Sequence, residues 1–95
     1  MPPVVTEVHI EHHASSQHTI IEVLTEDRPA LLFNLAEALH ALGVTISVAK
    51  ISTEGTRVID VFYVTEADGK KLAPGARSEH VRQVLLTSLR VERAS

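Results

Sequence analysis

The sequence predicts an α+β fold in which a four-stranded antiparallel sheet is covered on one face by two helices. Three observations support this prediction: 95 residues allow one domain only, four segments are rich in β-branched residues, and two segments repeat leucines at helical spacing. Along the chain these segments follow the order ββαββα, which two packed layers accommodate.

The first two strands are predicted from alternation and β-branching. Residues 4–12 alternate between a more apolar face and a more polar face, which is the pattern of a half-buried strand. A small polar connector follows, and residues 19–25 then form a β-branched run that we interpret as the second strand. We expect one domain over residues 1–95, with 1–3 as a disordered or foreign start, 4–13 as an additional strand and 14–95 as the core.

The first helix is predicted to start at Pro29, because proline is well placed in the first turn of a helix. Gly43 supplies the left-handed backbone that often ends a helix. At 100° per residue, one broad stripe contains six apolar residues: Leu31, Leu32, Leu35, Ala36, Leu39 and Leu42.

The second half of the chain predicts a hairpin and a closing helix. Residues 44–53 and 57–65 are β-branched runs joined by a short loop that contains Gly55. Turn residues follow, and residues 78–90 carry Val81, Leu85 and Leu89 at intervals of four. Together the elements predict a sandwich of the ferredoxin-like type.

Composition excludes several classes of partner and site. The net charge of −3 and the single basic pair Lys70-Lys71 argue against nucleic acid. Cysteine is absent, which excludes disulfides and Cys-based zinc sites. No apolar run approaches the roughly 20 residues that span a bilayer, so we expect a cytoplasmic protein that does not contact a membrane.

Both faces of the predicted sheet carry apolar side chains. Ile20 and Leu24 alternate with Ile21 and Val23 on the second strand, yet two helices can cover only one face. Because large exposed apolar patches usually mark interfaces, we expect a homo-oligomer, most simply a dimer.

Residues 19–39 contain Asp-Arg-Pro-x-Leu-Leu-Phe, and residues 60–64 read Asp-Val-Phe-Tyr-Val. With the Leu-Gly helix stop between them, these motifs resemble an ACT domain. The chain is similar, over almost its whole length, to the C-terminal ACT domain of enzymes that uridylylate and deuridylylate the PII nitrogen-signalling protein. The resemblance implies a regulatory domain that binds an amino acid, here glutamine, with no cofactor and no chemistry of its own. It also implies pairing of two copies and docking onto the catalytic domains of a parent enzyme.

The resemblance places the ligand site in the loop before the first helix and on the strand that follows this helix. Its residues are Thr25, Asp27, Arg28, Pro29, Ala30, Leu31, Leu32 and, from a partner copy, Thr45. ACT loops usually carry glycine where this chain has Ala30, and the added methyl leaves a second interpretation open: a domain that dimerises without a ligand.

Physical chemistry points to the same loop. Amides at the start of a helix lack intrahelical acceptors and can bind a carboxylate, while Asp27 can hold an ammonium group or merely cap the helix. Arg28 can pair with a carboxylate, or it is a solvated loop charge. Phe33 lies outside the apolar stripe, and we expect it either to be exposed at a contact with another subunit or domain or to pack under the N-terminal strand. Asp60 is expected to face solvent, with a buried acceptor as the alternative.

Parts of the sequence also bear on two other functions, metal binding and catalysis. Glu7, His9, Glu11 and His13 recur at every second residue, so a continuous strand would align them on one face as possible zinc ligands. A solvated strand face explains the same pattern, and we therefore predict no metal site. No Ser/His/Asp set has a recognisable catalytic spacing, and no glycine-rich phosphate loop is present, so we predict no enzyme active site.

Overall fold

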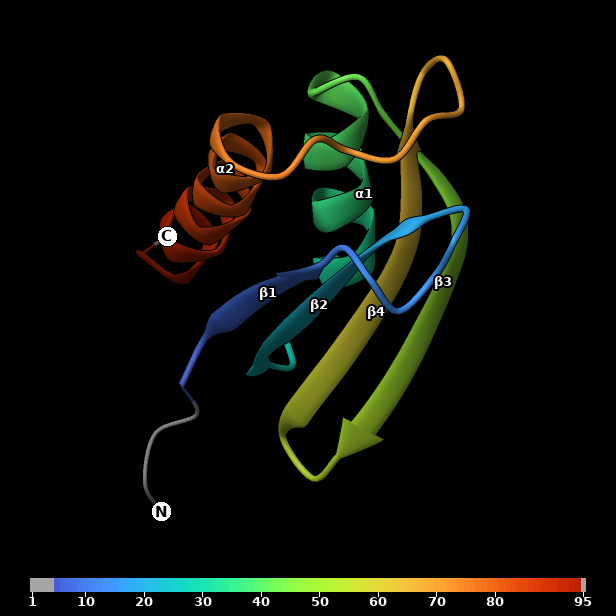
Figure 1. Ribbon diagram of the computed structural model, residues 1–95. Helices are drawn as coiled ribbons and strands as arrows, with labels where there is room; N and C mark the ends of the chain where they lie inside the picture. The colour runs from blue at the N-terminus through green and yellow to red at the C-terminus, as the bar shows by residue number, and fades with distance from the viewer. Residues whose placement is uncertain (1–4, 95) are drawn as a thin grey trace.

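The computed structural model describes residues 5–94, which form one sheet and two helices (Figure 1). The elements are β1 (Glu7–Glu11), β2 (Thr19–Glu26), α1 (Leu31–Ala41), β3 (Val44–Glu54), β4 (Arg57–Glu66) and α2 (Ala76–Ala94). All strand pairs are antiparallel, and the strands lie in the order β1-β2-β4-β3. Both helices lie on the same face of the sheet. The predicted ferredoxin-like ββαββα fold is therefore confirmed.

Three predicted element starts differ from the observed ones. The first strand begins at Glu7, whereas the predicted start at Val4 and the expectation for residues 1–3 lie outside the described residues. Helix α1 begins at Leu31 instead of Pro29, because Ala30 has a left-handed backbone with φ 59° and cannot join the helix. Helix α2 begins at Ala76, two residues earlier than expected, and its first turn is closed by a hydrogen bond from the Glu79 amide to the Gly75 carbonyl.

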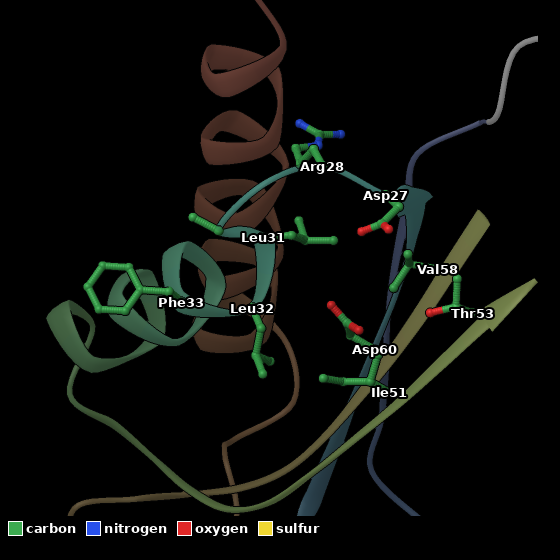
Figure 2. Close-up of a pocket in the computed structure, with 10 residues that line it drawn as sticks. Asp27, Arg28, Leu31, Leu32, Phe33, Ile51, Thr53, Val58 and Asp60 are labelled. Carbon is green, nitrogen blue, oxygen red and sulfur yellow. The ribbon is translucent and has the colours of Figure 1, made fainter. Parts of the chain in front are cut away.

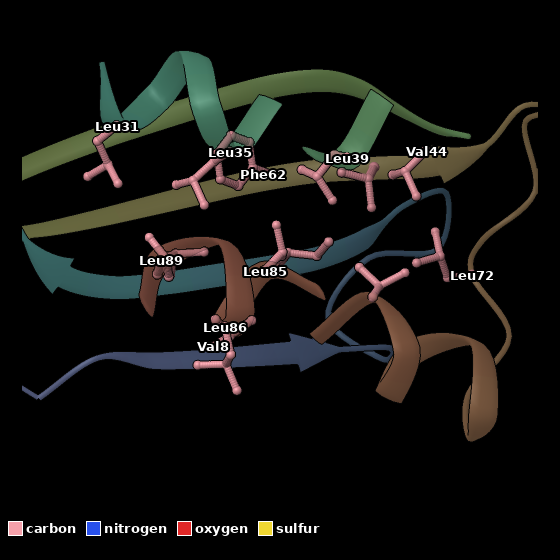
Figure 3. Packing of buried hydrophobic residues seen from close by; sticks show 14 of the residues in the cluster. Val8, Leu31, Leu35, Leu39, Val44, Phe62, Leu72, Leu85, Leu86 and Leu89 are labelled. Carbon is pink, nitrogen blue, oxygen red and sulfur yellow. The ribbon is translucent and has the colours of Figure 1, made fainter. Parts of the chain in front are cut away.

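The core lies between the sheet and the helices. On β2 the burial alternates, with Ile21 and Val23 fully buried toward the helices. Helix α1 contributes a narrower stripe than predicted, because Leu32 remains 37% exposed and Ala36 and Leu42 are only partly buried. Figure 3 shows the leucines of both helices packed over Phe62 and the strands. The most buried apolar residues of the helices are Leu31, Leu35, Leu39, Val81, Leu85 and Leu89.

The N-terminal strand β1 is an edge strand and still reaches the core. It pairs with β2, with Val8 opposite Val23, and the Val8 side chain is buried against helix α2 near Leu86 (Figure 3). Strand β3 forms the other edge. The β3–β4 hairpin extends well beyond the helices, so part of its helix-facing surface is uncovered (Figure 1).

The opposite face of the sheet carries apolar residues at its centre, as predicted. Tyr63 pairs with Ile20 across β4 and β2, and Ile59 pairs with Leu24, and all four side chains are half-buried. Within residues 5–94 no helix lies over this face. None of the helices described combines the length and the apolar character needed to cross a bilayer.

Candidate functional site

A cavity of about 250 Å³ opens where the uncovered part of the β3–β4 hairpin meets the start of helix α1 (Figure 2). Its walls come from the β2–α1 loop, the first turn of α1 and two facing residue pairs of the hairpin. The volume lies just below the range of about 300–1,000 Å³ that is usual for drug-sized ligands, which suits a small metabolite. The lining residues are Asp27, Arg28, Ala30, Leu31, Leu32, Phe33, Ile51, Thr53, Val58 and Asp60.

The start of α1, which lines this cavity, carries amides without a hydrogen-bond partner among the described residues. Ala30 is the N-cap residue and makes no side-chain capping hydrogen bond. The amides of Leu32 and Phe33 lie in the first helical turn, where the helix itself supplies no acceptors. These N–H groups and the positive end of the helix dipole can attract an anionic group, and no acidic residue occupies the first turn.

Asp27 is not a helix cap, which contradicts one of the two roles considered for it. Its backbone amide donates to the Thr56 carbonyl at 2.7 Å, which ties the loop to the tip of the β3–β4 hairpin. Its side chain is exposed, and the carboxylate points into the cavity (Figure 2). This carboxylate is therefore available to a ligand.

Asp60 is buried, so the expectation that it faces solvent is wrong. It lies on β4 opposite Val23 and Ile51, on the helix-facing side of the sheet, and is only 1% exposed. None of the described residues donates a hydrogen bond to either carboxylate oxygen. Burial raises the pKa of Asp60, and the nearby Asp27 carboxylate raises this pKa further.

Arg28 is not a solvated loop charge, whereas its pairing with a ligand carboxylate stays a prediction. Its guanidinium donates to the Leu89 carbonyl of α2 at 2.8 Å and to the Thr25 hydroxyl at 2.8 Å. The Thr25 hydroxyl also lies 3.0 Å from the hydroxyl of Thr6, on the segment that leads into β1. Arg28 therefore contributes its stem to the wall of the cavity while its charge joins the loop to α2 and β2 (Figure 2).

The remaining expected site residues divide into two groups. Ala30, Leu31 and Leu32 line the cavity, and Leu31 is also part of the core. Pro29 is exposed and does not line it, and Thr25 is fully buried beneath it.

Thr45 lies far from the cavity within one chain. It is exposed near the start of β3, opposite Thr65, whereas the cavity contacts the other end of this strand at Ile51 and Thr53.

Sequence reasoning missed the hairpin half of the cavity. Ile51 faces Asp60 across β3 and β4, and Thr53 faces Val58 in the same way. One signal was available: Asp60 shares its alternation with two residues of the core, Val58 and Phe62. Phe33 is 68% exposed at the rim, as expected from its place outside the apolar stripe.

The aligned acidic and histidine residues of the N-terminal strand do not converge in the structure. Glu7 and His9 approach each other to 3.4 Å on the outward face of β1, but His13 lies beyond the end of the strand. In the part of the chain that the structure describes, no three His, Cys, Asp or Glu side chains converge for a metal ion.

Comparison with known proteins agrees with the fold. Residues 14–92 match the family described as the ACR family N-terminal ACT domain. The chain is 46% identical over 80 residues to the bifunctional uridylyltransferase/uridylyl-removing enzyme of Azospirillum brasilense, which covers 84% of this chain and 9% of that protein. It is 44% identical over 89 residues to the enzyme of the same name from Streptomyces coelicolor, covering 94% of this chain and 10% of that protein.

The chain spans about a tenth of the length of the curated relatives that it matches. A match of this extent corresponds to a regulatory domain, and these residues do not hold the catalytic domains of the relatives. With the motifs, the ββαββα fold and the family match in agreement, the chain belongs to the ACT domain family and is related to the ACT domains of uridylyltransferase/uridylyl-removing enzymes.

Proposed function

We propose that this domain binds an amino acid, glutamine in the first instance, in the cavity at the start of α1. The observation that carries the proposal is the charge distribution around the cavity. The Leu32 and Phe33 amides can receive an α-carboxylate, and the Asp27 carboxylate can receive an α-ammonium group. One zwitterion would thus find both of its complements within a few residues.

We further propose that two copies of the domain pair, and that the ligand changes how the pair docks onto the catalytic domains of a uridylyltransferase-like parent protein. The half-buried apolar centre of the open sheet face and the exposed Phe33 supply surface for such contacts. A ligand can shift this equilibrium only by binding one arrangement more tightly than the other. Thr45, expected from a partner copy, remains part of this proposal, as does the expected cytoplasmic location.

A second function deserves a test because of Ala30. Glycine would adopt the left-handed backbone of Ala30 without strain and would leave no methyl group at the cavity. The alternative is therefore a domain that pairs without binding an amino acid. Titration calorimetry with each common amino acid, up to millimolar concentration, separates the two functions. Saturable heat with glutamine supports sensing, whereas no heat from any amino acid, together with a stable dimer in light scattering, supports the ligand-free alternative.

Asp27→Ala provides the matched variant for this titration. Its side chain is exposed, so the fold should persist while glutamine binding is lost. Glu37→Ala, an exposed acidic residue on α1 outside the cavity, serves as the control and should bind glutamine like the parent domain. Retained affinity in Asp27→Ala would remove Asp27 from the site.

A further inference from the structure

Asp60 is an unusual residue to find in the middle of a sheet. A buried carboxylate normally pairs with a cation or accepts several hydrogen bonds, because the loss of hydration is otherwise uncompensated. Here the side chain is 1% exposed, and neither oxygen accepts a hydrogen bond from the residues whose side chains the structure describes, 5–90. The other uses of a buried carboxylate, a capping bond or a salt bridge, therefore do not account for it.

Among the side chains that the structure describes, none supplies a cation to Asp60. Its neighbours across the sheet are Val23 on β2 and Ile51 on β3, which are both aliphatic. Helix α1 presents apolar side chains to the cavity and carries no acidic residue in its first turn. From the loop come Asp27, which is a like charge, and Arg28, whose guanidinium donates to Thr25 and Leu89 instead.

Asp60 and Asp27 nevertheless face the same cavity. Figure 2 shows both carboxylates pointing into the space between the loop, the start of α1 and the hairpin. Aliphatic walls formed by Leu31, Ile51 and Val58 surround this space and strengthen any charge interaction inside it. The cavity thus combines the negative potential of the Asp27 and Asp60 carboxylates with the positive potential at the N-terminal end of α1.

We propose that Asp60 is the counter-charge for the ammonium group of the bound ligand, and that it makes the cavity select amines over the corresponding 2-oxo acids. The proposal rests on the proposed function, because it assigns the inner end of the amino-acid site. The ligand inserts its ammonium group between Asp60 and Asp27 and leaves its carboxylate near the amides of Leu32 and Phe33. At pH values above the pKa of Asp60, a 2-oxo acid offers a carbonyl oxygen at the same place, and the two ionised carboxylates repel it.

The proposal has a consequence for proton exchange. In the empty cavity, burial and Asp27 favour the protonated form of Asp60, whereas a bound ammonium group favours the ionised form. Binding of an amino acid should therefore release a proton at pH values below the pKa of Asp60 in the empty domain. Affinity should rise as the pH rises through that pKa and then level off.

Calorimetry with L-glutamine and its 2-oxo analogue, 2-oxoglutaramate, tests the assignment. For the parent domain we expect glutamine to bind at least tenfold more tightly than 2-oxoglutaramate. Asp60→Asn, which keeps the shape of the side chain and removes its charge, should reduce that preference by tenfold or more. Asp68→Asn, an exposed turn residue outside the cavity, should leave the preference unchanged.

The outcomes separate the two proposals. Equal glutamine affinity in the parent domain and in Asp60→Asn overturns the role of Asp60 and leaves amino-acid binding intact. Failure of every common amino acid to bind the parent domain overturns both proposals. Should Asp60→Asn not fold, carboxyl-carbon NMR of the parent domain replaces it: added glutamine should lower the pKa of Asp60, and an unchanged pKa at saturating glutamine overturns the assignment.

Discussion

Asp27 and Asp60 present their carboxylates to one cavity, although the first lies in the β2–α1 loop and the second in the middle of β4. The carboxylate of the exposed Asp27 raises the pKa of the buried Asp60. Two like charges around a small apolar space are costly in the empty domain, and a ligand cation removes this cost. This arrangement links the stability of the domain to pH and, under the proposed function, to ligand.

The first prediction concerns stability against pH. The pKa of Asp60 is raised in the folded state above its ordinary 3.8, so the folded state holds a proton that the unfolded chain has lost. The stabilising contribution is complete below the ordinary pKa and is lost as the pH rises through the folded pKa. Chemical denaturation between pH 3 and pH 8 should show the parent domain losing stability relative to Asp60→Asn across this window.

The comparison with Asp60→Asn is needed because carboxylates with a lowered pKa change the free energy of unfolding in the opposite direction: their contribution falls as the pH falls. Hydrogen bonds from Arg82 and Gln83 lower the pKa of Glu79 to about 2, so any contribution from Glu79 is lost on acidification. Both proteins contain Glu79, and its effect cancels in the difference. Parallel pH profiles for the two proteins would contradict a raised pKa at Asp60.

The second prediction concerns Ala30. Its φ of 59° is left-handed, which costs an ordinary residue roughly 1–2 kcal/mol, whereas glycine adopts it freely. Replacing Ala30 by glycine removes this cost, but the larger entropy of glycine in the unfolded chain offsets part of the benefit, roughly 0.4–1 kcal/mol. Ala30→Gly should therefore raise the free energy of unfolding by about 0.5–1 kcal/mol in urea denaturation.

A matched control for this change is Ala36→Gly, which lies inside helix α1. Glycine there should destabilise the domain by about 1 kcal/mol, because it weakens a helix interior. If both glycine variants lose stability, the left-handed conformation of Ala30 is contradicted. If amino acids bind, Ala30→Gly should also bind at least as well as the parent domain, since it removes a methyl group from the cavity wall.

The third prediction concerns Arg28 as a structural residue. Its guanidinium donates to Thr25 and to the Leu89 carbonyl, and hydrogen bonds from charged donors contribute about 1.5–3 kcal/mol each when shielded from water. Because this side chain is only partly buried, we expect Arg28→Ala to destabilise the domain by about 2 kcal/mol. Thermal unfolding should show a drop of several degrees.

Arg82→Ala serves as the comparison for Arg28→Ala. Arg82 pairs with Glu79 at 2.8 Å on the surface of α2, and such exposed pairs contribute roughly 0–1 kcal/mol. A similar loss in both variants would contradict the difference in role between the two arginines.

The fourth prediction concerns pairing through the open sheet face. Val61→Lys places a charge at the half-buried centre of β4 and should convert a dimer to a monomer in light scattering. Thr87→Lys, on the exposed side of α2, should leave the dimer intact. A dimer that survives Val61→Lys would place the interface elsewhere, for example along the edge strand β3.

The elements could be predicted because their signals are local. Alternation marked β2 and β4, and leucines at helical spacing marked α1 and α2. The start of α1 was misplaced because Pro29 suits a first helical turn, while the left-handed Ala30 gives no signal in composition. The ACT resemblance, in which this position usually carries glycine, was the one indication of a left-handed backbone at Ala30.

The site could be predicted only where it is contiguous in sequence. Asp27, Ala30, Leu31 and Leu32 belong to one loop and one helix start, and the physics of helix ends identified them. Ile51 and Thr53 enter the cavity through the register of β3 against β4, which the sequence does not specify. Asp60 was misjudged because charged residues are seldom buried without a partner, and that rarity now makes it the most informative residue of the cavity.

Amide and carboxyl NMR of the parent domain during a glutamine titration tests the central proposal most directly. Binding in the cavity predicts saturable shifts at the Leu32 and Phe33 amides and at the Asp27 and Asp60 carboxyl carbons. Shifts should be small at Thr45 within a monomer and at Glu79 on α2. No saturable shift at the four cavity groups, with glutamine or with any other common amino acid, would contradict amino-acid binding at this site.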